Sequence, residues 1–466
     1  MKHRFISMIA ASFISAASFL SFADAPKYIF YFIGDGMGMA PAMAAATYNR
    51  SVLGTAELPL MMTFPVAGQV MTYSASSDVT DSAAAGTALA TGNKTVNGML
   101  GVTPDTTAVY SIAGILKDKL GYGVGLVTNV AADDATPGAF YAHVPHRKMA
   151  KEIDRQFAEG NVDFLAGASL NGLYDKDGNS TGVPELFEKN NIRLVNTIDE
   201  IGNGTERIAL IEKNPFHKSN IGYVNDSIPG KLTLTDMTQA CLDYLIRKTP
   251  DGFFMMVEGG NIDHALHGND GLSAISEIYN FNDALTVAYR FLLAHPEETL
   301  IVVTADHDTG GLSIGNNANG YVAHFDVLKS QKMSKEMFSD VCKKWLGSNR
   351  KQSWTNMKAF LKENFGFWGK VKIDDKETEA LKTLYADVFE KKNSKEEKSL
   401  YNNFNAFASE VFRLISKKAA VGFTTGAHTG NPVPVYSAGV GSENFGRLLN
   451  NTEIPAEILR ISGLSF

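Results

Sequence analysis

Cysteine is scarce in this sequence. Cys241 and Cys342 are the only two in 466 residues, so at most one disulfide can form. Each lies in an apolar stretch with a helical pattern, and the two are far apart along the chain. An oxidising compartment would permit a bridge, but the sequence alone does not bring the thiols within reach of each other. Two buried free thiols are the expectation, and a bridge is the alternative.

A strong basic stripe is also absent. The chain has 43 lysines and arginines against 50 aspartates and glutamates, which gives a formal net charge of −7. Nucleic-acid backbones are bound mainly through clustered lysine and arginine, so this balance argues against a nucleic-acid partner. It does not exclude small phosphate esters, which require only one local positive site. With 44% hydrophobic and 20% charged residues, the chain is predicted to be globular, not disordered or fibrous.

Long apolar runs are absent beyond the N-terminus. Residues 5–22 form an apolar run behind a short basic start, a pattern typical of an export signal, and small residues favour cleavage after Ala23. Residues 1–23 are therefore predicted to be a signal peptide, with the mature chain exported to a periplasm or secreted. A membrane anchor is the alternative. No later segment approaches the roughly 18 apolar residues of a membrane span, so no stable membrane insertion is expected of the mature chain.

Strand and helix patterns alternate through the first two-thirds of the chain. Compact apolar runs typical of buried strands lie at residues 28–33, 124–128, 253–257 and 300–304. Helical patterns begin near residue 41 and cover residues 111–120, 234–248 and 275–293. Near-continuous apolar strands alternating with helices predict an α/β fold, in which a central, mainly parallel β-sheet is sandwiched between helices.

The composition changes between about residues 319 and 418. Lysines multiply there, strand patterns disappear, and exposed amphipathic helices are predicted at residues 334–346, 354–364 and 377–392. We interpret this region as a helical surface insertion within a single domain of residues 24–466. Its charge runs indicate a solvated surface, and a role in binding or adhesion is the alternative. A β-rich run returns at residues 434–440.

Polar residues follow directly after three of the predicted strands. Asn129 follows the second, Glu258 the third, and Asp306 with His307 the fourth. In open α/β sheets, ligands bind at the carboxyl ends of the strands. These residues are therefore predicted to contribute to a single site.

Ser82 precedes a run of very small residues, Ala-Ala-Ala-Gly, and is predicted to lie in the first turn of a helix. The backbone N–H groups and the dipole at that end of a helix favour negative charge. A phosphoryl group on Ser82 would therefore be well placed. Taken alone, however, a serine or aspartate before an Ala-rich helix is usually only an N-cap.

Carboxylate and imidazole residues occur in pairs after the later strands. Asp263 and His267 are four residues apart, so one helical turn aims both side chains at a common point. Such a pair suits zinc, Asp306 and His307 supply a second pair, and His428 lies in a glycine-rich loop. Two zinc ions about 4 Å apart would clamp the attacking and leaving oxygens of an in-line phosphoryl displacement. Each set alone is often only an ion pair or a turn cap, but together they predict a metal site.

The ordered set of motifs resembles the alkaline phosphatase family over nearly the whole mature chain. The matching stretches are residues 34–38, 80–83, 134–137 with His143 and Arg147, 258–267, 304–307 and 427–430. Single pieces are weak, whereas the complete ordered set is highly specific. The resemblance implies an alkaline phosphatase, which is a phosphate-monoester hydrolase of broad specificity acting through a phosphoserine intermediate at a two-zinc plus magnesium site. It also implies a homodimer, with nucleic acid relevant only where phosphorylated ends serve as substrates.

The resemblance assigns roles to individual residues. The metal ligands that it implies are Asp263, His267 and His428 for the first zinc, Asp35, Asp306 and His307 for the second zinc, and Asp35, Thr136 and Glu258 for the magnesium. Ser82 would be the nucleophile, and Arg147 would hold two phosphate oxygens through its planar fork. Oxygen ligands at the third site suit Mg²⁺.

Two positions vary within the family. Asp134 matches members with an aspartate near the magnesium site, and His264 stands where some members carry lysine and others histidine. His264 is expected to contact phosphate or a bound water and not a metal. This combination leaves the metal preference of the third site open.

Two alternatives to a phosphomonoesterase remain at this stage. A phosphodiesterase or sulfatase of the same superfamily is one, but Ser82 lacks the following Pro-x-Arg of sulfatases. Related diesterases use a threonine nucleophile and lack magnesium ligands, whereas Thr136 and Glu258 are both present. The other is an inactive phosphate- or metal-binding protein, which would have lost a nucleophile or ligand. The sequence does not specify the physiological substrate.

Overall fold

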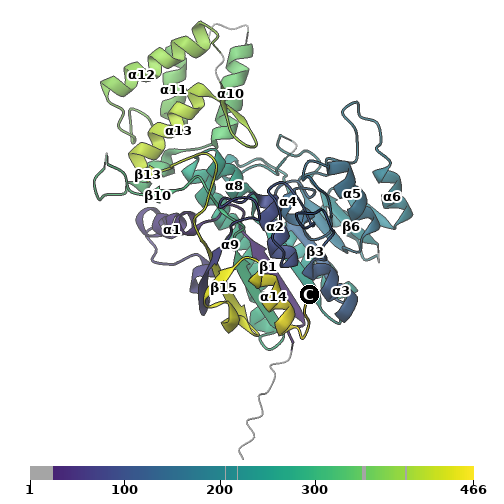
Figure 1. Ribbon diagram of the computed structural model, residues 1–466. Coiled ribbons are helices and arrows are strands. Elements are labelled where there is room, and N and C mark those ends of the chain that lie inside the picture. The colour runs from purple at the N-terminus through teal and green to yellow at the C-terminus, as the bar shows by residue number, and fades with distance from the viewer. Residues whose placement is uncertain (1–24, 205, 218, 318, 349–352, 394–395) are drawn as a thin grey trace, which may run out of the picture.

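The computed structural model describes residues 25–204, 206–217, 219–317, 319–348, 353–393 and 396–466 (Figure 1). Within these residues the centre is a ten-stranded sheet. In spatial order its strands are β16 (Leu448–Asn450), β2 (Val66–Met71), β15 (Val433–Gly439), β8 (Thr299–Thr304), β1 (Tyr28–Ile33), β7 (Phe253–Glu258), β3 (Gly123–Thr128), β4 (Phe164–Gly167), β6 (Arg207–Ile211) and β5 (Ile192–Val195). The predicted signal peptide, residues 1–23, lies outside the described residues.

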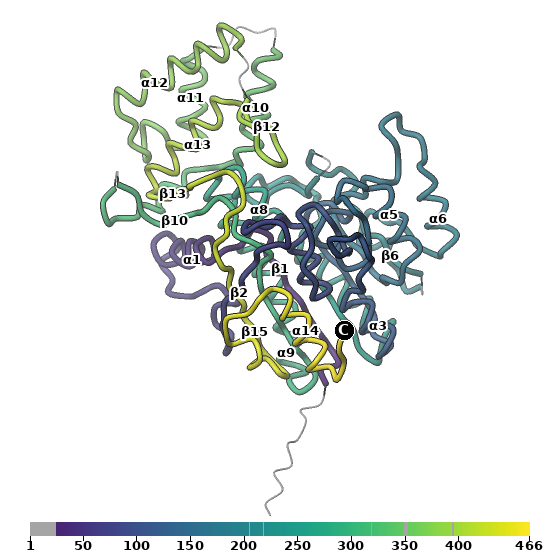
Figure 2. Tube along the Cα trace, viewed as in Figure 1, coloured from purple at the N-terminus to yellow at the C-terminus, as the bar shows by residue number. Residues whose placement is uncertain are grey.

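One strand runs against the others. β15 is antiparallel to both of its neighbours, β2 and β8, whereas the other neighbouring strands pair in parallel. Figure 2 shows this pairing as the yellow β15 beside the purple β2, so that segments from opposite ends of the chain lie together. The sheet is therefore mainly parallel, and the predicted fold class is confirmed.

Helices cover both faces of the sheet, which explains why its central strands are apolar along their whole length. Every residue of β3, β7 and β8 is buried. Along β1, the Phe30 ring packs against Phe291 of α9 (Gly271–Ala294), with 5.6 Å between ring centroids. The next residue, Tyr31, packs against Phe140 on the opposite face, at 6.2 Å. Successive side chains of a strand point to opposite faces, so both layers draw on the same apolar run.

The predicted insertion contains four helices among the described residues: α10 (Lys335–Gly347), α11 (Trp354–Phe365), α12 (Asp375–Tyr385) and α13 (Ala406–Ala419). They project from the sheet domain at the top of Figure 1 and share an apolar core, in which the Phe338 and Phe365 rings lie 4.9 Å apart. A short antiparallel pair, β10 (Ser313–Ile314) with β13 (Val421–Gly422), joins the two ends of the insertion.

The expectation that strands disappear from this region is wrong. β11 (Glu396–Lys398) and β12 (Asn403–Asn405) pair antiparallel and form a hairpin, which we call the insertion hairpin. Its strands are short and polar, and they obtain their order from contacts with α10 and the sheet domain. Such tertiary support leaves no periodic signal in the sequence.

The structure also bears on the two cysteines and on membrane-spanning helices. Cys241 on α7 (Leu234–Lys248) and Cys342 on α10 are both buried and free, as expected. Among the described residues, no helix has both the length and the apolar character needed to cross a membrane.

A histidine connects the sheet domain to the insertion. His217 Nδ1 lies 2.5 Å from Glu336 Oε1, and its Nε2 lies 2.6 Å from Asp340 Oδ2, both on α10. The hydrogen bonds to Asp340 and Glu336 raise the pKa of His217 to about 10. The imidazole is therefore protonated at neutral pH and joins the two parts of the molecule through a pair of ionic contacts.

Replacing His217 by asparagine is expected to destabilise the protein by about 1 kcal/mol at pH 7, a value that allows for solvent screening of this partly exposed group. Asparagine is chosen because residue 217 has a φ of +50°, which asparagine tolerates. Because the folded-state pKa lies above the unfolded value, the contribution is fully present below about pH 6.5 and is lost as pH rises through about 10. Thermal unfolding from pH 6 to 10.5 should show the two Tm curves converging, and a constant gap would contradict the assignment.

Candidate active site and metal centre

Four neighbouring strands bring the predicted site residues to one edge of the sheet. β8, β1, β7 and β3 are adjacent and parallel, and Ile33 at the end of β1 pairs with both Thr304 and Glu258. Thr128 at the end of β3 also pairs with Glu258. Residues that follow these strand ends must therefore gather at the carboxyl edge, as the sequence predicts.

Ser82 is the first residue of α2 (Ser82–Thr91), a helix in which every residue is buried. Asp81 caps it by accepting a hydrogen bond from the backbone N–H of Ala84 through Oδ1, and its Oδ2 accepts one from the backbone N–H of Gly98 in a neighbouring loop, both at 2.9 Å. The Ser82 Oγ lies 3.2 Å from His307 Nε2. The nucleophile candidate therefore lies at the positive end of a helix and in contact with a candidate metal ligand.

The first cluster consists of Asp35, Asp306 and His307. His307 Nε2 lies 3.2 Å from Asp306 Oδ2 and 3.4 Å from Asp35 Oδ1. One ligand atom from each residue falls within 4.8 Å of the others. Asp306 Oδ1 accepts from the backbone N–H groups of Gly36 and His307, at 3.1 and 2.9 Å, which fixes the carboxylate and leaves Oδ2 facing the cluster.

The second cluster consists of Asp263, His267 and His428. Asp263 and His267 lie on α8 (Gly260–His267), one turn apart as predicted, with Oδ2 and Nε2 separated by 3.2 Å. His428 Nε2 lies 3.0 Å from His267 Nε2 and 3.8 Å from Asp263 Oδ1. Asp263 and His428 also form a ligand group with His307, so the two clusters adjoin.

Gly36 allows the loop after β1 to approach the second cluster. Its φ is +69°, and a Cβ on this residue would lie 2.8 Å from Asp263 Oδ1 and 2.9 Å from Thr309 Oγ1. A side chain here would be strained and would push Asp263 away. The glycine therefore keeps Asp35 and Asp263 in neighbouring positions.

The imidazole rings are oriented by carbonyl groups behind them. His267 Nδ1 lies 2.7 Å from the Gly426 carbonyl oxygen, and His428 Nδ1 lies 2.9 Å from that of Thr80. Because a carbonyl oxygen can only accept, each Nδ1 carries the proton and each Nε2 offers a lone pair to the cluster. This arrangement is typical of metal-binding histidines.

Both clusters contain buried carboxylate oxygens that lack a hydrogen-bond partner, as expected of metal ligands. Asp35 Oδ1, Asp263 Oδ2 and Asp306 Oδ2 are buried and have no hydrogen-bond partner among the described residues. Burial, followed by repulsion from neighbouring carboxylates, raises the pKa of Asp35 well above its usual range and that of Asp306 to about 7. Divalent cations would compensate these charges, and the mixed oxygen and nitrogen donors suit zinc.

A third group of oxygen atoms lies beside Asp35. The Glu258 carboxylate accepts a hydrogen bond from the Thr128 hydroxyl, and burial raises the pKa of Glu258 to about 8. Thr136, on the short helix α4 (Ala135–Gly138), has a buried hydroxyl with no hydrogen-bond partner among the described residues. An oxygen-only donor set of this kind suits Mg²⁺.

Arg147 reaches the site from a loop and is held by two acids. Its Nη2 lies 2.7 Å from Asp134 Oδ1, and its Nη1 lies 3.6 Å from Asp81 Oδ2. Asp134 precedes α4, and Asp81 precedes Ser82, so the guanidinium lies between the third oxygen group and the nucleophile candidate. This position suits a planar group that recognises phosphate oxygens.

Tyr401 is a site residue that sequence analysis missed. It lies in the turn of the insertion hairpin, and its ring centroid is 3.9 Å from that of His264 and 5.3 Å from that of His267. His264 is buried, and its Nδ1 has no hydrogen-bond partner among the described residues. No motif surrounds Tyr401 in the sequence, so only the tertiary structure reveals it.

Thr309 is a second missed residue. Its hydroxyl donates to Asp263 Oδ1 at 2.5 Å and lies 3.1 Å from His307 Nδ1, so it links the two clusters. In this case a signal existed, because Thr309 follows Asp306 and His307 by only a few residues.

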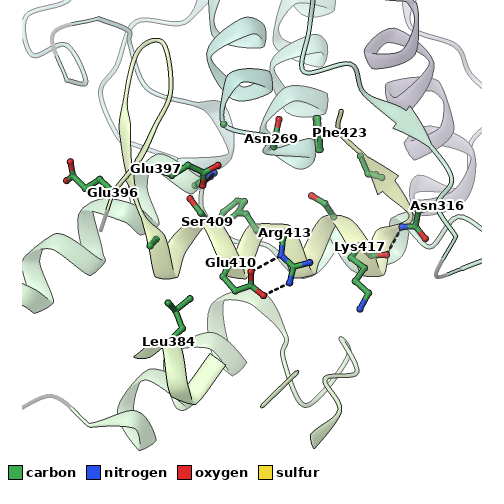
Figure 3. Close-up of a pocket in the computed structure, with 16 residues that line it drawn as sticks. Asn269, Asn316, Leu384, Glu396, Glu397, Ser409, Glu410, Arg413, Lys417 and Phe423 are labelled. Atoms are coloured by element: carbon green, nitrogen blue, oxygen red, sulfur yellow. Dashed lines mark hydrogen bonds and ion pairs between the residues drawn. The ribbon is translucent and has the colours of Figure 1, made fainter. Parts of the chain in front are cut away.

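A cavity of about 590 Å³ opens onto the second cluster. His267 and His428 line it together with residues near Ser82 and with the insertion hairpin. A larger cavity, of about 820 Å³, lies between α13 and the end of α8, and Figure 3 shows its lining. None of the predicted site residues is among the residues that line the larger cavity. The smaller cavity is therefore the one connected to the candidate chemistry.

Comparison with known proteins gives consistent matches. The family model described as "Alkaline phosphatase" matches residues 26–171 and 186–464. The chain is 31% identical to alkaline phosphatase 3 of Bacillus subtilis, over 94% of this chain and 89% of that protein. It is 30% identical to alkaline phosphatase 4 of the same organism, over 93% of this chain and 88% of that protein.

Solved structures agree with the sequence relatives. A cold-active alkaline phosphatase from a Shewanella species is 26% identical, with a TM-score of 0.78 over 93% of this chain and 99% of that chain. The Thermus thermophilus alkaline phosphatase is 25% identical, with a TM-score of 0.78 over 96% of this chain and 93% of that chain. The family resemblance stated from the motifs is confirmed.

Proposed function

We propose a mechanism on the premise that the chain belongs to the alkaline phosphatase family and is a phosphomonoesterase. Ser82 Oγ attacks the phosphorus of a phosphate monoester, the bond to the alcohol oxygen breaks, and a phosphoserine forms. Water then attacks the phosphoserine, which releases inorganic phosphate and restores Ser82. The observation that carries this proposal is the placement of Ser82 Oγ at the N-terminus of α2, 3.2 Å from His307 Nε2.

The proposed metals are two zinc ions and one magnesium ion. The first zinc would be held by the second cluster, which is Asp263, His267 and His428. The second zinc would be held by the first cluster, which is Asp35, Asp306 and His307. The magnesium would be held by the third oxygen group, which is Asp35, Thr136 and Glu258. When bound, the ions supply charge stabilisation at the attacking and leaving oxygens. Support comes from the unpaired buried carboxylate oxygens and the carbonyl-oriented rings.

The chain's own residues orient the phosphate. Arg147 presents two nitrogens for two phosphate oxygens, and Asp134 and Asp81 hold the guanidinium in place from outside. The N–H groups at the start of α2 favour the negative charge that builds on the phosphoryl group. We propose that His264, buried under Tyr401, contacts the phosphate or a water near it and does not bind a metal.

The proposal extends to the whole chain. Residues 24–466 would form one catalytic domain that carries the insertion of about residues 319–418, and residues 1–23 would direct export to the periplasm or the medium. The family model matches residues 186–464 without a break, so the match runs through the insertion, and this supports a single unit. A homodimer and broad specificity for small phosphate esters complete the proposal.

The proposed function is tested by comparing three substrates in the metal-replete protein. p-Nitrophenyl phosphate should be hydrolysed with a kcat/KM at least about tenfold above that of bis-p-nitrophenyl phosphate or p-nitrophenyl sulfate. The monoester should be preferred because its terminal phosphate has three free oxygens, which Arg147 and the N-terminus of α2 can bind together. Preference for the diester or the sulfate would contradict the assignment within the superfamily. Absence of all turnover would favour a phosphate- or metal-binding protein.

A further inference from the structure

The insertion hairpin reaches from the insertion to the active site. Its turn is closed by the Ser399 N–H, which donates to the Asn402 carbonyl oxygen at 2.8 Å. The Tyr401 ring lies on His264, and the buried Phe404 ring packs beside Gly268 at the end of α8. Figure 2 shows the hairpin on the side of the insertion that faces the sheet domain. A segment of the insertion thus forms part of the wall around the site.

The hairpin is held from behind by α10. Lys335 Nζ lies 4.4 Å above the Phe404 ring and 3.6 Å from Glu397 Oε2. The Asn405 N–H donates to Ser339 Oγ at 2.8 Å. Together with the ring contact of Tyr401, these bonds fix both strands and the turn. The hairpin is therefore held against α10 through its two strands and against His264 through Tyr401.

The 590 Å³ cavity lies between this wall and the segment before Ser82. His267 and His428 line it, with Val79 on one side and Leu400 and Phe404 from the hairpin. Leu400 is 59% exposed and Val79 is 37% exposed, although each lines the cavity. Apolar side chains in such a position gain stability when a ligand covers them.

The charges around the cavity restrict the ligand further. The lining includes two acids, Asp81 and Glu397, and one lysine, Lys398. Asp81 lies 3.6 Å from Arg147 and Glu397 lies 3.6 Å from Lys335, so both acids are already paired and the lining offers no strong net charge to bind a charged alcohol. The apolar surface and the charge therefore point to the same class of ligand, a neutral organic group.

We propose that the insertion hairpin builds a subsite for the alcohol part of the substrate and that, within a broad range of phosphate monoesters, this subsite raises kcat/KM for those of neutral aryl or bulky apolar alcohols. The inference rests on the proposed function. If Ser82 attacks the phosphate of an ester, the alcohol part of that ester must lie beside Ser82, where this cavity opens. The second cluster then faces the leaving oxygen, and the alcohol extends towards Leu400 and Val79.

The larger cavity does not compete for this role. Figure 3 shows its lining beside the hairpin, with the Glu410–Arg413 ion pair on α13 and with Glu397 near the hairpin. Glu397 lines both cavities, so the hairpin separates them. Only the smaller cavity includes His267 and His428.

The subsite is tested with Leu400→Ser in the full chain. The kcat/KM for 1-naphthyl phosphate should fall about tenfold, which corresponds to loss of most of the contact with one leucine. The kcat/KM for glycerol 2-phosphate and the inhibition constant of inorganic phosphate should change less than about twofold, since neither covers Leu400. Val79→Ser should show the same selectivity on the opposite wall.

Leu293→Ser is the matched control, because Leu293 is 64% exposed at the end of α9 and does not line this cavity. It should leave all three quantities unchanged. If kcat/KM fell equally for both esters, or if kcat/KM for the naphthyl ester fell in neither Leu400→Ser nor Val79→Ser, the subsite would be overturned. The proposed function would stand in either case, because the protein would still hydrolyse monoesters. A wild-type protein that hydrolyses neither ester would overturn the proposed function, and the subsite with it.

Discussion

Replacing Ser82 by alanine is expected to lower kcat for phosphate monoesters by about 10³-fold or more, because it removes the atom that forms the covalent intermediate. The substitution is conservative for the fold. Three alanines follow Ser82 in a fully buried helix, and the capping bonds of Asp81 do not involve the Ser82 hydroxyl. Binding of inorganic phosphate should therefore persist, since Arg147 and the α2 N-terminus are unchanged.

The same variant separates two mechanisms. In the wild type, acid quenching during turnover should trap phosphate on the peptide that contains Ser82, and mass spectrometry of Ser82→Ala should find none. Ser111→Ala is the control, because Ser111 caps α3 (Ile112–Leu120) and its loss should cost about 1 kcal/mol of stability without a change in kcat. If Ser82→Ala kept more than about a tenth of the wild-type kcat, direct attack by water would replace the phosphoserine route.

The metal-ligand candidates were predictable because of where they lie relative to strands. Asp306 and His307 follow β8 after the single residue Ala305, and Asp263 and His267 come one helical turn apart after β7. Apolar runs locate buried strands, and parallel strands bring their carboxyl ends to one edge. Local sequence therefore determines which residues meet, and the structure adds the distances between them.

The insertion shows the limit of the same reasoning. Three of its helices match amphipathic patterns, but the insertion hairpin and α13 do not follow from any pattern that we identified. Tyr401 reaches His264 only because α10 holds the hairpin through Lys335 and Ser339. Contacts between segments that are far apart in the chain depend on the packing of whole elements, which local periodicity does not specify.

Removing the metals is expected to abolish turnover and to lower Tm by several degrees. An ion present at about 1,000 times its Kd stabilises the folded state by roughly 4 kcal/mol, and chelation removes that contribution. In this site the loss has a structural reason. Asp35, Asp306 and Asp263 each leave a buried carboxylate oxygen without a hydrogen bond, and cations are the groups that would compensate them. Adding Zn²⁺ and Mg²⁺ back should restore both activity and Tm.

The loss of stability should depend on pH in a defined direction. In the metal-free chain, burial raises the pKa of Glu258 to about 8 and that of Asp306 to about 7. Because these folded-state values lie above the unfolded ones, the two carboxyl groups contribute most to the stability of the metal-free protein near pH 4, and this contribution is lost as pH rises to about 8. Metal binding requires deprotonated ligands and therefore strengthens over the same range. The Tm gap between metal-replete and chelated protein should thus widen from pH 5 to pH 8.

Asp306→Asn separates this effect from a general influence of pH. Asparagine keeps the shape of the side chain and removes one buried charge, so the chelated variant should lose less stability between pH 5 and pH 8 than the chelated wild type. The variant should also gain less Tm from added Zn²⁺, because it lacks one anionic ligand of the first cluster. A Tm gap that stays constant with pH in the wild type, or an unchanged zinc response in Asp306→Asn, would show that the buried carboxylates do not hold the metals that stabilise the fold.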